Sequence, residues 1–231
     1  MNTHVPAFDG LEIQTGPEPS WTVIWLHGLG ADGHDFEPIV PELVRPGWPA
    51  LRFVFPHAPV RPVTINGGAP MRAWYDIRSF ELSQRADEAG VRESIATVEA
   101  LIARENARGV PDDRIVLAGF SQGGAIVLSA AVRHSKKLAG VVALSTYLPM
   151  AENTTAEASE ANRALPVFQG HGTADPIVPM SLGSQSRDVL VQLGHPVEWH
   201  TYPMPHSVCM EEIRDLAAWF QARFAAAQPA N

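Results

Sequence analysis

Five residues, Gly119-Phe120-Ser121-Gln122-Gly123, constrain the fold of this chain more than any other segment, because they read Gly-x-Ser-x-Gly. The apolar run at 114–118 before them predicts a buried strand, and the apolar run at 124–132 after them predicts a helix. At such a sharp turn, the flanking glycines remove Cβ clashes and the central serine is pushed out toward substrate. The helix N-terminus behind it supplies amide donors. The pattern therefore predicts a nucleophilic Ser121; the alternative is a glycine-rich turn with an incidental serine.

The remaining segments alternate between strand-like and helix-like patterns, which is typical of an α/β fold with a mostly parallel sheet. The central runs are apolar throughout, so we expect helices to cover both faces of the sheet. One helix is expected at residues 83–108. A last helix is expected where Ile213 and Phe224 fall on one apolar face. Two stretches, 59–80 and 151–164, look irregular, and the second is expected to be a surface excursion. The expected strands cover residues 21–27, 51–55, 114–119, 139–145, 166–170 and 197–202, with an edge strand at 11–15.

Composition excludes several classes of protein. At 231 residues, a single domain spanning 1–231 is the simplest count. The net charge of −8 argues against nucleic acid and anionic membrane surfaces as partners. Cys209 is the single cysteine, which excludes an intrachain disulfide and fits a cytoplasmic protein. Residues 1–6 lack the pattern of a signal peptide and no apolar run approaches membrane-spanning length, so no integral membrane association is expected.

A nucleophilic serine needs an acid and a base in a definite order. The hydroxyl requires a base within hydrogen-bond reach, and the base requires an orienting acid. In α/β-hydrolases the acid follows the serine and the histidine comes last. Asp175 fits the acid, because it lies in a glycine-rich loop just after an apolar strand, whereas Asp188 and Asp215 lie in expected helices. The alternative role for Asp175 is an Asx-turn before Pro176.

His206 is the best candidate for the base among nine histidines. It lies between the last expected strand and the last helix, after the acid in the chain. A lone loop histidine is more often a plain surface residue, so this prediction depends on Ser121 and Asp175 being present in order. Three other histidines lie in less suitable places: His134 near the end of the helix after the serine, His195 in a turn and His200 in a strand.

Acyl transfer also needs donors for the oxyanion. One is expected from the backbone N–H of Gln122, directly after the nucleophile. The second normally comes from a His-Gly loop after an earlier strand, and here His27-Gly28-Leu29-Gly30 follows such a strand. The backbone N–H of Leu29 is therefore the expected second donor. His27 itself is expected to hold the loop, and the alternative for the segment is a plain glycine-rich turn.

Metal and cofactor chemistry find little support in the sequence. Neither H-E-x-x-H nor a Cys/His ligand spacing occurs, so no catalytic metal is expected. No G-x-G-x-x-G opens a helix after the first strand, which disfavours a dinucleotide. We therefore expect no cofactor.

Six blocks of sequence together resemble the phospholipase/carboxylesterase family, the bacterial relatives of acyl-protein thioesterases. They occur in family order between residues 25 and 207, and as a set they are far more specific than Gly-x-Ser-x-Gly. The blocks are Trp25-Leu26-His27-Gly28-Leu29-Gly30-Ala31-Asp32-Gly33-His34-Asp35-Phe36, Phe55-Pro56-His57-Ala58-Pro59, Met71-Arg72-Ala73-Trp74-Tyr75-Asp76, Gly119-Phe120-Ser121-Gln122-Gly123-Gly124, His171-Gly172-Thr173-Ala174-Asp175 and Met204-Pro205-His206-Ser207.

The resemblance implies a compact α/β-hydrolase without a large cap domain, and it agrees with the residue-based assignment of catalytic and oxyanion groups. It also places the segment around Trp74 beside the acyl pocket, so that this ring and Met71 would line an apolar groove. The alternative is that Trp74 packs a long loop onto the core.

The resulting expectation is a serine carboxylesterase that hydrolyses short- to medium-chain esters through an acyl-serine intermediate. An acyl-protein thioesterase or lysophospholipase is the alternative among enzymes. A hydrolase-fold protein that binds ligands without turnover is the alternative from another class. The expected partner is a small-molecule ester or acyl thioester, and a homodimer is left open because dimers occur in such families.

Overall fold

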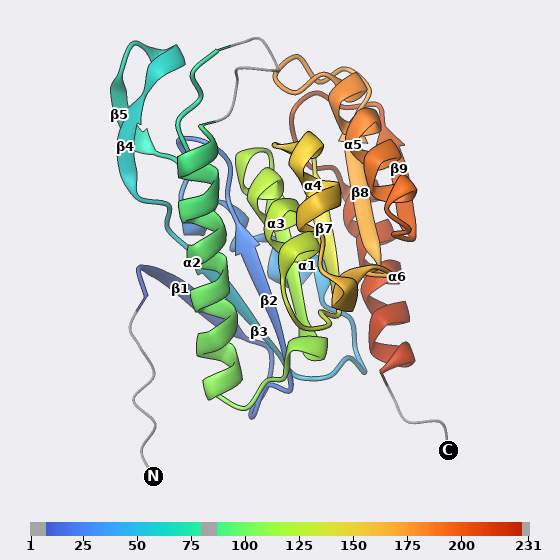
Figure 1. Ribbon diagram of the computed structural model, residues 1–231. Helices are drawn as coiled ribbons and strands as arrows, with labels where there is room; N and C mark the ends of the chain where they lie inside the picture. Colours follow the sequence, from blue (N-terminus) through green and yellow to red (C-terminus); the bar gives the residue numbers. More distant parts are fainter. Residues whose placement is uncertain (1–7, 80–86, 228–231) are drawn as a thin grey trace.

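A mostly parallel sheet of seven strands forms the centre of the molecule, in the order β1-β3-β2-β6-β7-β8-β9 (Figure 1). The computed structural model describes residues 8–79 and 87–227. Within this sheet, the edge strand β1 alone runs antiparallel to its neighbour, β3. The predicted mostly parallel sheet is thus found, and the edge strand expected at 11–15 is β1. The strands are β1 Gly10–Gln14, β2 Trp21–Leu26, β3 Leu51–Pro56, β6 Ile115–Phe120, β7 Gly140–Leu144, β8 Val167–Gly172 and β9 Val197–Tyr202.

Helices cover both faces of this sheet, as expected from its continuously apolar strands (Figure 1). Side chains alternate along each strand, so Ile24 and Leu117 pack toward one helical layer while Val23 and Val116 pack toward the other. The first layer contains α2, α3, α4 and α5, and the second contains α1 and α6. The helices are α1 Ile39–Leu43, α2 Glu88–Ala107, α3 Gln122–Arg133, α4 Ala151–Glu157, α5 Met180–Gln192 and α6 Met210–Ala226. The start expected for α2 at residues 83–86 lies outside the described residues.

The two stretches expected to be irregular contain regular structure. In residues 59–80, β4 (Val60–Val63) and β5 (Ala69–Arg72) form a separate antiparallel pair. The glycines that suggested irregularity mark its turn, where Gly67 and Gly68 have φ angles of 67° and 77°. In residues 151–164, α4 is followed by a 3-10 turn at Glu160–Asn162. At the end of α4, Glu157 accepts a hydrogen bond from Arg133 of α3 at 2.6 Å, which ties this short helix to its neighbour.

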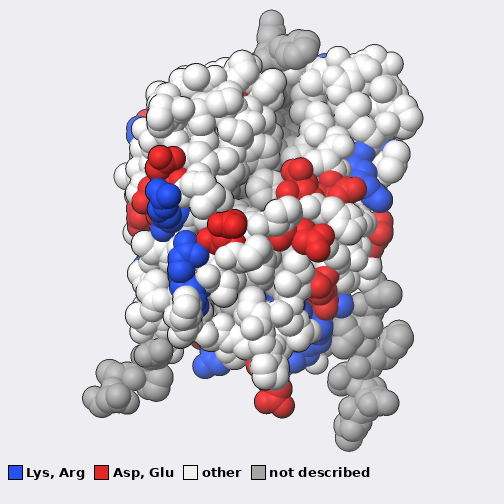
Figure 2. Space-filling view, turned by 180° about the vertical axis from the view of Figure 1, so that it is seen from behind, with Lys and Arg blue, Asp and Glu red and all other residues white. Residues whose placement is uncertain are grey.

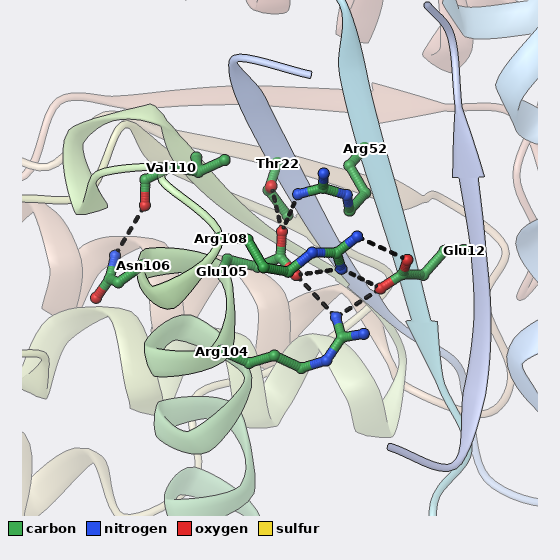
Figure 3. Close-up of polar contacts among 8 residues, drawn as sticks. All are labelled: Glu12, Thr22, Arg52, Arg104, Glu105, Asn106, Arg108 and Val110. Carbon is green, nitrogen blue, oxygen red and sulfur yellow. Dashed lines mark hydrogen bonds and ion pairs between the residues drawn. The ribbon is translucent and has the colours of Figure 1, made fainter. Parts of the chain in front are cut away.

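A buried ionic cluster anchors α2 to the first three strands (Figure 3). Glu105 is fully buried and accepts hydrogen bonds from Arg52 of β3 at 2.7 Å and from the Thr22 hydroxyl of β2 at 2.9 Å. Arg108 joins Glu105 to Glu12 of β1, at 3.1 Å and 2.6 Å. Arg52 and Thr22 lie near the amino ends of their strands. The cluster therefore fixes the end of the sheet opposite the carboxyl edge, and leaves that edge to the loops described next.

Candidate active site

Ser121 lies at a sharp turn between the end of β6 and the start of α3, as predicted. Its φ of 53° and ψ of −119° place a non-glycine residue in a strained conformation. Two bonds hold it there: its backbone N–H donates to the carbonyl of Leu144 at 2.9 Å, and its own carbonyl accepts from the Thr146 hydroxyl at 2.6 Å. The end of β7 therefore supports the strain that turns the serine side chain outward.

The glycines on either side of Ser121 are required by close backbone approach. A Cβ on Gly119 would lie 2.5 Å from the carbonyl carbon of Gly123, and a Cβ on Gly123 would collide with the carbonyl oxygen of Leu26. The two glycines of Gly-x-Ser-x-Gly thus allow β6, the first turn of α3 and the end of β2 to pack closely together.

Ser121, His206 and Asp175 come together at the carboxyl edge of the sheet. The Ser121 Oγ lies 2.9 Å from Nε2 of His206, and Nδ1 of His206 lies 2.7 Å from Oδ2 of Asp175. Since the carboxylate accepts only, Nδ1 carries the proton and Nε2 is free to accept from the serine hydroxyl. The ring of His206 also packs against Phe120, with centroids 4.7 Å apart. This is the hydrogen-bonded sequence that a Ser–His–Asp nucleophile requires.

The loop that carries Asp175 is closed by the second oxygen of the same carboxylate. Oδ1 accepts from the backbone N–H groups of Ile177 and Val178, each at 2.9 Å. The Asx-turn considered as an alternative from the sequence therefore coexists with the contact to His206, because the two oxygens face different partners. At Gly172, any Cβ would collide with the carbonyl oxygens of Met204 and Pro205. This glycine lets the acid loop and the base loop lie against each other.

The His-Gly loop lies beside the nucleophile, where oxyanion donors are needed. A Cβ on Gly28 would be 3.5 Å from the Cβ of Ser121. Gly30, at a φ of 77°, donates its N–H to the Arg72 carbonyl at 2.8 Å and so ties the loop to β5. Within the described residues the N–H of Leu29 has no protein acceptor. The N–H of Gln122 is in the first turn of α3, where helices leave donors unpaired. Both amides are therefore available to an oxyanion.

His27 holds this loop, in the structural role expected for it. Its Nδ1 bonds the carbonyl of Gly28 at 2.7 Å, and its Nε2 accepts from the N–H of Ala58 at 3.0 Å. Burial lowers the pKa of His27. A neutral ring with its proton on Nδ1 satisfies both contacts.

The side chain of Gln122 makes contacts that no sequence pattern predicted. Its Oε1 accepts from the backbone N–H of Trp74 and its Nε2 donates to the carbonyl of Tyr75, both at 2.8 Å. Trp74 in turn donates its Nε1–H to the carbonyl of His27 at 2.9 Å. One residue thus offers its backbone amide to the site and braces the loop that faces it with its side chain.

Trp74 does not line a groove in this structure. Its side chain is 1% exposed and lies in the core beneath the His27 loop, so the expected substrate contact is corrected to the packing alternative. Met71 lies differently. It is partly exposed, accepts from the amide of Asn66 at 3.3 Å, and its sulfur is 3.9 Å from where a Cβ of Gly30 would be. Met71 is therefore next to the loop that carries Leu29.

Residues 8–79 and 87–227 contain neither a cluster of metal-binding side chains nor a membrane-spanning helix. Among these residues, no group of three or more His, Cys, Asp or Glu side chains is arranged to hold a metal ion. In the same part of the chain, no helix is both long enough and apolar enough to span a bilayer.

A serine on a strained strand-to-helix turn, joined through a histidine to an aspartate at the carboxyl edge of a mostly parallel sheet, defines a serine hydrolase of the α/β-hydrolase class. The chain belongs to the phospholipase/carboxylesterase family, whose model matches residues 10–223.

The chain is similar in sequence to acyl-protein thioesterases. The chain is 42% identical over 226 residues to acyl-protein thioesterase 1 of Cryptococcus neoformans, covering 90% of this chain and 94% of that protein. It is 41% identical to acyl-protein thioesterase 1 of Mycosarcoma maydis, covering 90% and 93%.

Solved structures agree with this grouping. Arabidopsis thaliana SOBER1 superposes with a TM-score of 0.83 at 32% identity, covering 88% of this chain and 98% of that one. Zea mays acyl-protein thioesterase 2 superposes with a TM-score of 0.80 at 29% identity, covering 93% and 99%. The chain is accordingly a serine hydrolase that acts on ester bonds.

Proposed function

We propose that this protein is an acyl thioesterase that removes acyl groups from cysteine side chains of proteins, using Ser121, His206 and Asp175 as its catalytic residues. The observation that carries the proposal is the hydrogen-bonded chain from Ser121 Oγ to Asp175, at 2.9 Å and 2.7 Å, beside two available amides. The resemblance to acyl-protein thioesterases supports the thioester over the short- to medium-chain carboxylic ester first expected from the sequence.

In the first half of the reaction, Ser121 Oγ attacks the acyl carbonyl while Nε2 of His206 takes the hydroxyl proton. Asp175 holds the ring in the required tautomer and stabilises the imidazolium that forms. The backbone N–H groups of Leu29 and Gln122 donate to the oxyanion of the tetrahedral intermediate. Collapse of the intermediate expels a thiolate, which receives the proton from His206 and departs as a thiol.

In the second half, water replaces the thiol. His206 removes a proton from the water, which attacks the acyl-Ser121 carbonyl and forms a second tetrahedral intermediate on the same two amides. Breaking the ester bond returns the proton to Ser121 Oγ and releases a carboxylic acid. Since a cysteine thiol has a pKa of about 8.5, its thiolate is a far better leaving group than an alkoxide, and the first half is correspondingly easy.

The surroundings of the site suit an acyl group that arrives attached to a large molecule. Ile177, two residues after Asp175, is 56% exposed, and Met180 is 38% exposed. On the face seen from behind, Lys, Arg, Asp and Glu gather over the middle and lower parts, while the upper end is largely uncharged (Figure 2). Exposed apolar side chains near the site favour contact with acyl chains and apolar protein surface. Met71 is proposed as a further substrate contact beside Leu29.

A matched pair of peptides tests the substrate class. The peptides share one sequence and one acyl chain, attached through a cysteine sulfur in the first and a serine oxygen in the second. We expect kcat/KM to be higher for the thioester. A higher kcat/KM for the oxyester would instead support the carboxylesterase, and hydrolysis confined to lysophospholipid micelles would support the lysophospholipase.

Variants of two serines test the catalytic assignment. Ser121→Ala should lower kcat by several orders of magnitude, on the scale of triad removal. Ser129→Ala is the matched control, because Ser129 is also buried but lies within α3, further along the chain than Ser121. Unchanged turnover in Ser121→Ala would end the proposal, and binding without turnover in the native protein would favour a ligand-binding role.

Three further assignments are proposals of the same kind. The single cysteine and the acidic charge support a cytoplasmic location. A single domain over residues 1–231 and a homodimer are proposed from length and family respectively. Size-exclusion chromatography with light scattering tests the dimer.

A further inference from the structure

His171 is a buried histidine that the mechanism above does not use. It lies near the carboxyl end of β8, four residues before Asp175, and is fully buried. Its Nε2 is 2.8 Å from the carbonyl oxygen of Val178 and 3.6 Å from Oδ2 of Asp175. That Oδ2 is the same oxygen that accepts from His206. The two histidines therefore lie close to the same carboxylate oxygen.

The contacts of His171 determine its protonation. A backbone carbonyl accepts only, so Nε2 carries the proton and donates it to Val178, while Oδ2 of Asp175 lies 3.6 Å away, beyond hydrogen-bond distance. Among the described residues, Nδ1 has no hydrogen-bond partner and is shielded from solvent. Burial lowers the pKa of His171. A neutral ring of this kind gives the acid loop a donor without placing a positive charge next to the carboxylate on which His206 depends.

The position of the ring is set by elements on two sides. A Cβ on Gly183 of α5 would lie 2.5 Å from Nδ1, so the helix passes directly over the ring. Trp199 of β9 lies on another side, with ring centroids 6.1 Å apart and planes inclined by 27°. Its own strand fixes the backbone. The ring of His171 is therefore held in place by α5, by Trp199 and by its own strand.

Val178 is held at both of its backbone polar groups. Its N–H donates to Oδ1 of Asp175 at 2.9 Å, while its carbonyl accepts from His171 at 2.8 Å. The carboxylate, Val178 and the imidazole are thus joined by a continuous chain of two hydrogen bonds. Through this chain the orientation of the Asp175 side chain is coupled to the ring of His171.

We propose that His171 is a positioning residue for the reaction: by donating to the carbonyl of Val178, whose N–H donates to Asp175, it fixes the carboxylate of Asp175 in the orientation that His206 requires. This inference rests on the proposed function. It differs from a purely structural role, in which loss of His171 would lower stability but leave the Asp175–His206 contact of the folded enzyme unchanged.

The first test compares two buried histidines. His171→Phe removes the donor and keeps a ring; His195→Phe makes the same change at a histidine that is also buried, also has an unpartnered Nδ1, and precedes the amino end of β9. We expect His171→Phe to lower kcat by about 10- to 100-fold with little change in KM, the scale of a catalytic group misplaced by about 1 Å. His195→Phe should keep kcat. The low-field proton resonance of His206 Nδ1–H should move in His171→Phe and stay in place in His195→Phe.

Two more variants separate chemistry from folding. His171→Gln places an amide N–H near the position of Nε2 and should restore most of kcat and the resonance. Gly183→Ala keeps His171 but crowds its ring, so it should lower kcat even though α5 tolerates alanine. If His171→Phe does not fold, Gly183→Ala and His171→Gln carry the test.

An unchanged kcat and an unmoved resonance in the folded His171→Phe protein, or in Gly183→Ala, would overturn the inference. That outcome is distinguishable from failure of the proposed function. Failure of the proposed function appears as full activity in Ser121→Ala, which no result on His171 can produce.

Discussion

Glu212 offers a quantitative prediction about stability and pH. It lies in the first turn of α6, is fully buried, and neither of its carboxyl oxygens has a hydrogen-bond partner among the described residues. The carboxyl group packs so closely on β8 that a Cβ on Gly170 would overlap it. Burial raises the pKa of Glu212 to about 8 from an ordinary value of 4.5; a backbone contact at Cys209 opposes the rise and the charge of Asp215 adds to it.

The magnitude follows from proton linkage. The folded protein retains this proton up to about pH 8, whereas the unfolded chain releases it above pH 4.5. Stability therefore falls as pH rises between these values and levels off above the folded pKa. At about 1.4 kcal/mol per pH unit, Glu212 lowers the free energy of unfolding by roughly 1 kcal/mol at pH 5 and by roughly 4 kcal/mol at pH 8.

Replacement of Glu212 by glutamine removes the titration and keeps the shape. We expect the free energy of unfolding of Glu212→Gln, relative to the native protein, to be about 3 kcal/mol more favourable at pH 8 than at pH 5. Any cost of burying the amide is common to both pH values and cancels in the difference. Urea unfolding followed by circular dichroism, at constant ionic strength, measures it. Glu211→Gln is the matched control, because Glu211 is the preceding residue and is exposed.

Parallel stability curves for the native protein and Glu212→Gln between pH 5 and pH 8 would refute this reasoning. They would mean that the carboxyl ionises in the fold at its ordinary pKa, and hence that water or a cation reaches it. A change of slope in Glu211→Gln equal to that in Glu212→Gln would assign the effect to general surface charge instead.

Two other predictions test the neighbouring parts of the molecule. Burial alone would lower the pKa of His134, but hydrogen bonds to Glu99 and Asp112, at 2.9 Å each, outweigh it and raise the pKa above 6.5. The stabilisation by protonated His134 is thus complete below pH 6.5 and is lost as pH rises through the folded pKa. We therefore expect His134→Gln to lower Tm more at pH 5.5 than at pH 9. Equal losses of Tm at the two pH values in thermal melts would contradict this prediction. Gln122→Ala removes two buried hydrogen bonds but keeps the backbone N–H, so we expect a loss of about 2 kcal/mol in urea unfolding and a lower kcat. A fluorophosphonate probe should still label its Ser121; full kcat would show that the 74–75 loop does not need this brace.

The meeting of Ser121, Asp175 and His206 was predictable because each residue follows a parallel strand. Loops after such strands meet at one edge of a sheet, so chain order was enough to bring Ser121, Asp175 and His206 together. The glycines that mark the turn carry a local signal that needs no knowledge of distant contacts. The expectation for Leu29 had the same origin, since its loop follows β2.

Other features depend on contacts that no local pattern encodes. The side chain of Gln122 bonds residues 47 and 48 positions away, and nothing in its neighbours indicates that. The fate of Trp74 was open for the same reason, because a tryptophan in a Pro- and Gly-rich segment suits both a groove and a core. The β4–β5 pair lies outside the main sheet, where short strands have weak alternation. The sequence pattern places Glu212 in an amphipathic helix, but its burial depends on the packing of α6 against β8, which no local pattern predicts.

The brace between Gln122, Trp74 and His27 has a consequence for the order of events in refolding. It joins three segments distant in sequence, and without it the loop bearing Leu29 has lost one of its supports. Local structure, such as α3 and its turn, forms on a faster timescale than contacts with large sequence separation. We therefore expect a refolding chain to regain helical circular dichroism before it regains turnover. Catalytic activity would then return late in refolding, so that an incompletely folded chain does not hydrolyse esters.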